Sequence, residues 1–129
     1  MSAYVDTNIL VRHVAEDDGA LSPRAARLLG RTGPLILTST VFLETAHVLR
    51  SRYGYARDDV VTALHGILGL PSIAGDLELL ASALEHHLVN RIDLPDALLV
   101  ARALREGPPV IASFDRELDR VPGLERLAP

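Results

Sequence analysis

The sequence of 129 residues has no cysteine, and lysine is also absent, so all 13 basic residues are arginine. Without cysteine there can be no disulfides and no thiolate metal sites, which suits a reducing compartment. Mechanisms that require a lysine are excluded. No apolar run is long enough to span a bilayer, and no basic region followed by an apolar stretch marks a signal peptide. We therefore expect a cytoplasmic protein with no membrane association.

Positive charge is also in short supply, because the formal net charge is −4. This balance argues against a protein that coats nucleic acid through bulk electrostatic attraction. Hydrophobic residues make up 48% of the chain, which indicates a well-filled core. A chain of this length fits one domain, and we expect that domain to span residues 1–129.

Short apolar segments typical of strands alternate with segments of helical periodicity. We predict strands at residues 3–6, 35–38, 72–74 and 109–113, with a further edge strand at 123–127. Helices are predicted from Thr7–Asn8, from Pro23 with Ser22 as its N-cap, and after a cap at Ser39 or Thr40. Further helices are predicted over 57–70, from Asp76 to about 89, and over 95–106. This alternation predicts an α/β fold with a mostly parallel sheet covered by helices on both faces.

Asp6 stands where the first predicted strand gives way to a helix. In open α/β sheets, ligands bind at the carboxyl ends of the strands, so this position favours a functional carboxylate. The competing interpretation is an N-cap, in which Asp6 accepts hydrogen bonds from backbone N–H groups at the helix start. The other acidic residues must decide between the two.

Three further acids resemble Asp6 in their placement. Glu44 shares a predicted helix face with Val41 and Val48, and Asp96 shares one with Leu99, Val100 and Ala103. Asp115 directly follows an apolar strand. Asp96 could instead be a first-turn acid favoured by the helix dipole, with Asp93 as the N-cap, whereas Glu44 has no capping role.

Carboxylates on core-facing positions are costly unless a cation neutralises them. An unpaired buried carboxylate costs several kcal/mol, and neighbouring like charges add repulsion. Taken together, Asp6, Glu44, Asp96 and Asp115 therefore predict a site for a hard divalent cation. Oxygen ligands alone favour Mg²⁺ or Mn²⁺ over Zn²⁺.

Four segments in this order resemble the motifs of PIN domains, and specifically of VapC-type ribonuclease toxins from toxin–antitoxin pairs. The segments are Tyr4–Leu10, Phe42–Leu49, Ile92–Ala101 and Ile111–Asp115, and they cover essentially the whole chain. Each motif alone is weak, but four in order with α/β spacing are fairly specific. The family often has threonine where Ser113 stands, which keeps the hydroxyl.

The resemblance implies a three-layer α/β/α sandwich with a central, mostly parallel sheet of four or five strands. It implies a metal-dependent endoribonuclease with Asp6, Glu44, Asp96 and Asp115 around Mg²⁺ or Mn²⁺. We expect Asp6 and Asp96 to bind the metal directly, and Glu44 and Asp115 to hold a second ion or orient water. Accessory roles are expected for Thr7, Asn8, Asp93 and Ser113.

The same resemblance implies homodimers, an RNA substrate and a small cognate antitoxin whose C-terminal segment occupies the acidic groove. RNA could be held locally by arginines, among which Arg12, Arg50, Arg52, Arg102 and Arg116 are the candidates.

Two other function classes remain open at this point. A phosphoacceptor, either receiver-like or haloacid-dehalogenase-like, also carries an aspartate at the end of its first strand. The absence of lysine and of a second aspartate at position 8 argues against it. A non-catalytic binding module with a PIN fold is the other alternative, and the complete set of acids argues against that.

Overall fold

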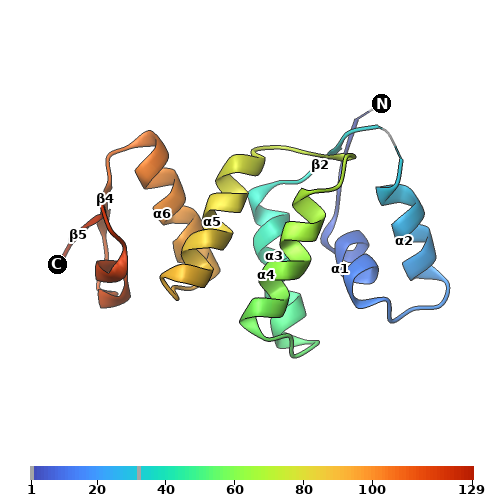
Figure 1. The fold of residues 1–129 in the computed structure, drawn as a ribbon, viewed down its shortest axis with the longest axis horizontal. Helices are drawn as coiled ribbons and strands as arrows, with labels where there is room; N and C mark the ends of the chain where they lie inside the picture. The colour runs from blue at the N-terminus through green and yellow to red at the C-terminus, as the bar shows by residue number, and fades with distance from the viewer. Residues whose placement is uncertain (1, 32) are drawn as a thin grey trace. The chain divides into compact units, whose positions relative to one another are not determined.

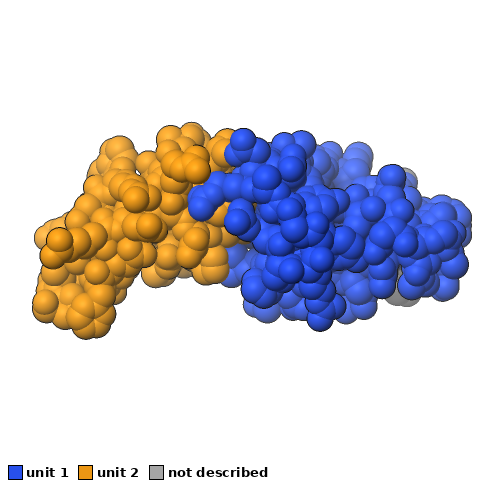
Figure 2. All heavy atoms as spheres, turned by 90° about the horizontal axis from the view of Figure 1, so that it is seen from below, with its two compact units in different colours: residues 1–77 blue, residues 78–129 orange. Residues whose placement is uncertain are grey.

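A computed structural model describes residues 2–31 and 33–129 of the chain. The chain divides into two compact units, residues 1–77 and 78–129, which Figure 2 distinguishes by colour. Figure 1 shows the helices and strands along the chain. Each unit is described by itself below.

The first unit contains a three-stranded parallel sheet in the order β1–β2–β3. Its strands are β1 (Ala3–Tyr4), β2 (Leu35–Ile36) and β3 (Ile73–Ala74). Ala3 is paired with Leu35, and Leu35 with Ile73. Because the strands are parallel, their carboxyl ends meet at one edge of the sheet, and this edge leads into α1 and α3.

Four helices follow these strands in the first unit: α1 (Thr7–Ala15), α2 (Leu21–Leu29), α3 (Ser39–Ser51) and α4 (Arg57–Leu68). α1 contacts both α2 and α3, and α3 contacts α4. The core of the unit includes the fully buried side chains of Leu10, Leu35, Phe42 and Leu49. Packing around these residues fixes the helices that carry Asp6 and Glu44 at their polar ends and edges.

The second unit is built from α6 (Leu94–Glu106), β4 (Val110–Ala112), the short 3₁₀ helix η1 (Arg116–Arg120) and β5 (Glu125–Leu127), together with most of α5 (Leu77–Val89). β4 and β5 pair in parallel, with Val110 opposite Glu125. Asp115 therefore follows β4 in the same way that Asp6 follows β1.

The order and type of the predicted elements are confirmed. The strands are parallel, as expected, and in the described residues they form one three-stranded and one two-stranded sheet. Two predicted N-caps, those of α2 and α3, were wrong, and the starts of α5 and α6 differ from the predicted ones by one residue. Thr38, rather than Ser39 or Thr40, caps α3, with its side chain accepting a hydrogen bond from the N–H of Val41 at 3.3 Å. α2 begins at Leu21, so Ser22 lies inside its first turn. No helix in the described residues is long and apolar enough to cross a membrane.

Two glycines of the first unit predict opposite effects of an added methyl group. Gly75 has a φ of 135°, and a Cβ there would lie 2.7 Å from the carbonyl oxygen of Leu37. Gly75→Ala should therefore destabilise the protein by about 2 kcal/mol or more through backbone strain and this clash. Urea unfolding measures the change in the free energy of unfolding.

The matched control is Gly66→Ala in α4, where an added Cβ meets no atom within 4 Å. This substitution should stabilise the protein by about 0.5–1 kcal/mol because alanine restricts the unfolded chain and favours the helix. Equal effects of the two substitutions would show that the backbone at Gly75 is not constrained as described.

Candidate active site

Asp6 is the N-cap of α1, two residues beyond the end of β1. One of its carboxylate oxygens, Oδ1, accepts a hydrogen bond from the backbone N–H of Thr7 at 2.8 Å. The capping interpretation is therefore correct as far as this bond goes. A carboxylate has a second oxygen with further acceptor capacity, so capping and ligand binding are compatible at Asp6.

Glu44 lies on α3, but the expectation that it faces the core is wrong. The buried residues of α3 are Phe42, Thr45, Ala46 and Leu49, whereas Glu44 is exposed. This choice of face buries the large side chains of Phe42 and Leu49. Asp6 is also exposed. Neither Asp6 nor Glu44 therefore carries the cost of a buried carboxylate.

Asp6 and Glu44 nevertheless line one pocket. Its volume is about 230 Å³, and its wall is formed by α1 and α3 with the residues that follow α3. The lining side chains are those of Asp6, Thr7, Asn8, Val11, Arg12, Glu44, Val48, Arg52 and Tyr53. The first unit thus brings together two of the four principal acids, two accessory residues and two of the candidate arginines.

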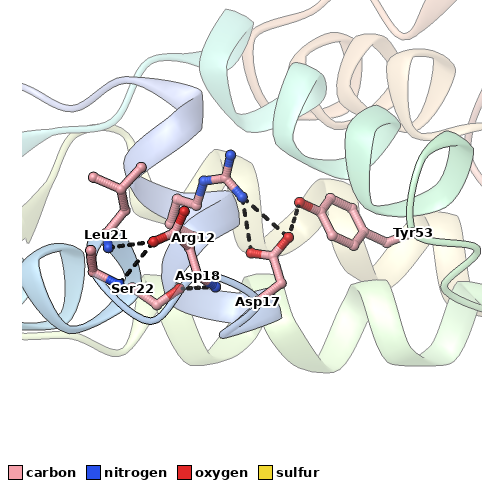
Figure 3. A network of polar contacts seen from close by, with 7 residues as sticks. Arg12, Asp17, Asp18, Leu21, Ser22 and Tyr53 are labelled. Carbon is pink, nitrogen blue, oxygen red and sulfur yellow. Dashed lines mark hydrogen bonds and ion pairs between the residues drawn. The ribbon is translucent and has the colours of Figure 1, made fainter.

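A polar network holds one of these arginines in place (Figure 3). Nη1 of Arg12 donates to both carboxylate oxygens of Asp17, at 3.0 and 3.1 Å, and the hydroxyl of Tyr53 donates to Oδ2 of Asp17 at 2.7 Å. The Tyr53 hydroxyl and then Arg12 lower the pKa of the Asp17 carboxyl from its ordinary value. Asp17 therefore joins the end of α1 to the end of α3.

Asp96 occupies the first turn of α6 in the second unit and is half-buried. The pKa of its carboxyl is raised above the ordinary value of 3.8, first because burial disfavours the charged form. The like charges of Asp115, Asp93 and Glu117 raise it further, in that order. Leu99, expected on the same inward face, is 50% exposed, so that part of the predicted face is wrong.

Asp115 is the N-cap of η1 and is half-buried. Its Oδ1 accepts a hydrogen bond from the N–H of Glu117 at 2.9 Å, and its own N–H donates to the hydroxyl of Ser113 at the same distance. Ser113 thus positions the backbone of Asp115. Asp93 is the N-cap of α6 by position, but its side chain makes no capping hydrogen bond.

The PIN domain family matches residues 3–124 of the chain. The chain is a PIN domain. This membership confirms the α/β/α fold class expected from the sequence. PIN domains are generally nucleases that act on nucleic acid and use divalent metals. A search of curated proteins found none that matches this PIN domain.

The donor chemistry of the PIN domain suits a hard cation. Oxygen donors line the pocket of the first unit, and carboxylates crowd around Asp96 in the second. Within residues 2–31 and 33–129, no three histidine or acidic side chains are grouped closely enough to hold a metal ion. In the first unit the hydroxyl oxygen of Thr7 is buried and has no hydrogen-bond partner among the residues that the structure describes, so it is available to a ligand or to a carboxylate that holds one. The residues therefore fit Mg²⁺ or Mn²⁺ in kind, and each unit offers a pair of carboxylates.

The sequence motifs do not show which of the candidate arginines lie near the acids. The spacing of residues along α1 and α3 favours Arg12 and Arg52. Glu44, Val48 and Arg52 are spaced four residues apart on α3 and just beyond it, so they share a face. Arg12 follows Asn8 by the same interval on α1. Of the other candidates, Arg102 pairs with Glu106 at 3.3 Å. Neither Arg50 nor Arg116 lines the pocket.

The raised pKa of Asp96 predicts that Asp96→Asn stabilises the PIN domain at neutral pH. A carboxyl whose pKa is higher in the folded than in the unfolded state loses stability as the pH rises through that interval. Its ionised form is therefore unfavourable at pH 7, and asparagine removes the cost. The midpoint of urea unfolding in EDTA should rise at pH 7, and the difference should shrink as the pH falls toward 3.8.

Asp58→Asn provides the matched control. Asp58 lies in the first turn of α4, where the helix dipole stabilises a negative charge. Its replacement should lower the stability by about 0.3–1 kcal/mol at neutral pH. A destabilised Asp96→Asn variant at pH 7 would contradict the account of the Asp96 environment.

Proposed function

We propose that this PIN domain is a metal-dependent endoribonuclease that hydrolyses RNA phosphodiester bonds and acts as the toxin of a toxin–antitoxin pair. The observation that carries the proposal is the pairing of acids within each unit. Asp6 and Glu44 share a pocket, and Asp96 is close enough to Asp115 for the two charges to interact. Membership of a family of nucleases gives this pairing its chemical meaning.

In this proposal Asp6, Glu44, Asp96 and Asp115 hold Mg²⁺ or Mn²⁺. When bound, such an ion supplies an activated water and neutralises charge that develops on phosphorus. The Asp6 carboxylate is oriented by the hydrogen bond that it accepts from the Thr7 N–H, and the Asp115 carboxylate by the one that it accepts from the Glu117 N–H. Ser113 holds the backbone of Asp115. Fixed carboxylates lose little freedom on binding a cation, so this capping geometry favours the site.

The accessory residues have distinct tasks. Thr7 and Asn8 line the pocket beside Asp6. The Thr7 hydroxyl, which has no partner among the described residues, and the exposed Asn8 amide can donate to a carboxylate or to a phosphate oxygen there. Ser113 positions Asp115. The negative charge of Asp93 raises the pKa of the Asp96 carboxyl, after the larger effects of burial and of Asp115.

The toxin role extends the proposal to partners. We propose a homodimer in the cytoplasm, controlled by a cognate antitoxin whose C-terminal segment blocks the acidic groove. Four intact acids and the resemblance to VapC-type toxins support this role. The absence of lysine and of an aspartate at position 8 argues against a phosphoacceptor, and the complete set of acids argues against a non-catalytic binding module.

Induced expression tests the proposed function. Expression of the wild-type chain should arrest growth, and mapping of RNA ends should reveal new cleavage sites that are missing when Asp6→Asn is expressed at an equal level. Arrest by both variants with identical RNA profiles would contradict a ribonuclease. Labelling of Asp6 by acetyl phosphate would instead support a phosphoacceptor.

A further inference from the structure

The pocket of the first unit holds charges of both signs. Asp6 and Glu44 contribute two carboxylates, and Arg12 and Arg52 contribute two guanidinium groups. A purely acidic pocket would repel the phosphates of RNA, and the chain as a whole carries a net charge of −4. Attraction for a polyanion must therefore be local, and these two arginines line the same pocket as Asp6 and Glu44.

The guanidinium of Arg52 has no hydrogen-bond or ion-pair partner within the described part of the chain, although its backbone N–H donates to the carbonyl oxygen of Val48 at 2.9 Å. It caps the C-terminal end of α3 and is exposed. Asp17 raises the pKa of the neighbouring Tyr53 hydroxyl, and the positive charge of Arg52 partly opposes that shift. A cation that lines a pocket without a partner is available to an anionic ligand.

Arg12 is held through one end only. Asp17 accepts two hydrogen bonds from Nη1 of Arg12, and Tyr53 in turn orients Asp17 (Figure 3). Neither Nε nor Nη2 of Arg12 makes a hydrogen bond within the described residues. The side chain is therefore oriented in advance while part of its donor fork remains available, which reduces the entropy lost on binding.

Thr7 supplies an independent sign of an unfilled polar site. The residue is 6% exposed, lines the same pocket, and its hydroxyl oxygen has no hydrogen-bond partner in the described residues. A buried hydroxyl without a hydrogen-bond partner is unfavourable, so the site favours any ligand that offers a partner.

We propose that Arg12 and Arg52 bind a phosphate of the RNA backbone in this pocket, and that Asp17 and Tyr53 are positioning residues for Arg12. The inference rests on the proposed function and assigns the substrate contact within it. Guanidinium groups pair with phosphate oxygens through two parallel hydrogen bonds, which suits a backbone contact that does not depend on base sequence. The carboxylates beside them then meet the nucleic acid at a fixed distance from the anchored phosphate.

RNA binding without cleavage tests the inference. The Asp96→Asn substitution is used as the background because it removes a proposed metal ligand, and hence cleavage, in the second unit. It does not change any residue that lines the pocket of the first unit. Fluorescence anisotropy with a short, labelled, single-stranded RNA of mixed sequence measures affinity over a range of salt concentrations. Arg52→Ala in this background should weaken binding about tenfold and reduce the slope of log K against log salt by about 0.7, the value for one lost contact with a single strand.

Three further variants separate anchoring from a structural role. Arg50→Ala, on α3 but outside the pocket, should leave the affinity and the salt slope unchanged. Arg12→Lys should keep the salt slope but lose affinity, because an ammonium cannot reproduce the fork. With otherwise active protein, Tyr53→Phe should raise KM while kcat changes little.

The outcomes distinguish this inference from the proposed function. If Arg52→Ala binds RNA with unchanged affinity and salt slope while metal-dependent cleavage is present in the wild type, the phosphate site is wrong and the ribonuclease stands. If no cleavage occurs under any condition but binding depends on Arg52, the phosphate site stands and the ribonuclease is wrong.

Discussion

Asp96→Asn is expected to lower the rate of RNA cleavage by at least about a hundredfold while the protein remains folded. A bound metal ion stabilises transition-state charge by several kcal/mol, and each 1.36 kcal/mol changes the rate tenfold. Because the same substitution should stabilise the protein at neutral pH, the loss of activity cannot be assigned to unfolding. The measurement is the single-turnover cleavage rate at saturating Mg²⁺, with circular dichroism as the check on folding.

Asp93→Asn and Asp58→Asn calibrate this result. Asp93 lies one turn from Asp96, and its negative charge helps to raise the pKa of the Asp96 carboxyl. Replacement of Asp93 should therefore have a much smaller effect on cleavage than replacement of Asp96. Asp58, in the first turn of α4, is not among the residues that line the pocket and should not affect the rate. Equal rates for Asp96→Asn and Asp58→Asn would contradict a catalytic role for Asp96.

Removal of divalent ions should abolish cleavage, and Mg²⁺ or Mn²⁺ should restore it. The proposed ligands are all oxygens, which favour these hard ions. Excess EDTA is therefore expected to reduce the rate to the background of the Asp6→Asn variant, and dialysis into Mg²⁺ or Mn²⁺ to return it fully. Time courses with the wild-type protein before and after chelation measure the effect.

The salt concentration must be held constant in that comparison, since RNA binding itself weakens as salt rises. Ca²⁺ is a useful control because it binds oxygen ligands at longer distances and in less regular geometry. Undiminished cleavage in excess EDTA would contradict metal dependence, whatever the behaviour of the variants.

Much of the fold follows from local signals that a sequence displays directly. The step from β1 through Asp6 into α1 is marked by strand formers, a capping acid and helical periodicity within eight residues. The start of α2 was misplaced because Ser22–Pro23 imitates a cap. In the structure, Oδ1 of Asp18 accepts hydrogen bonds from the N–H groups of Ala20 and Leu21 at 2.9 and 2.7 Å.

The orientation of α3 could not be read from periodicity alone. Thr45 counts as polar in a sequence pattern, yet it is fully buried because its hydroxyl donates to the carbonyl oxygen of Val41 at 2.7 Å. This internal bond lets the face of Phe42 and Leu49 turn inward, and it moves Glu44 to the exposed edge. Patterns that treat every hydroxyl as exposed therefore rotate the helix.

The positioning of Arg12 depended on contacts that are distant in sequence. Tyr53 and Asp17 are 36 residues apart, so no local pattern reveals their hydrogen bond. The acids themselves were identifiable because each stands at a strand end or in a helix next to apolar residues. Their pairing within each unit required coordinates.

Calorimetric titration with Mn²⁺ tests most directly whether the acids proposed as ligands bind a metal ion. The wild-type protein, Asp6→Asn and Asp96→Asn should be compared at constant pH and salt. Each substitution is expected to weaken Mn²⁺ binding by at least about tenfold, because each removes a proposed ligand. Wild-type affinity in either variant would contradict the role of that aspartate as a metal ligand.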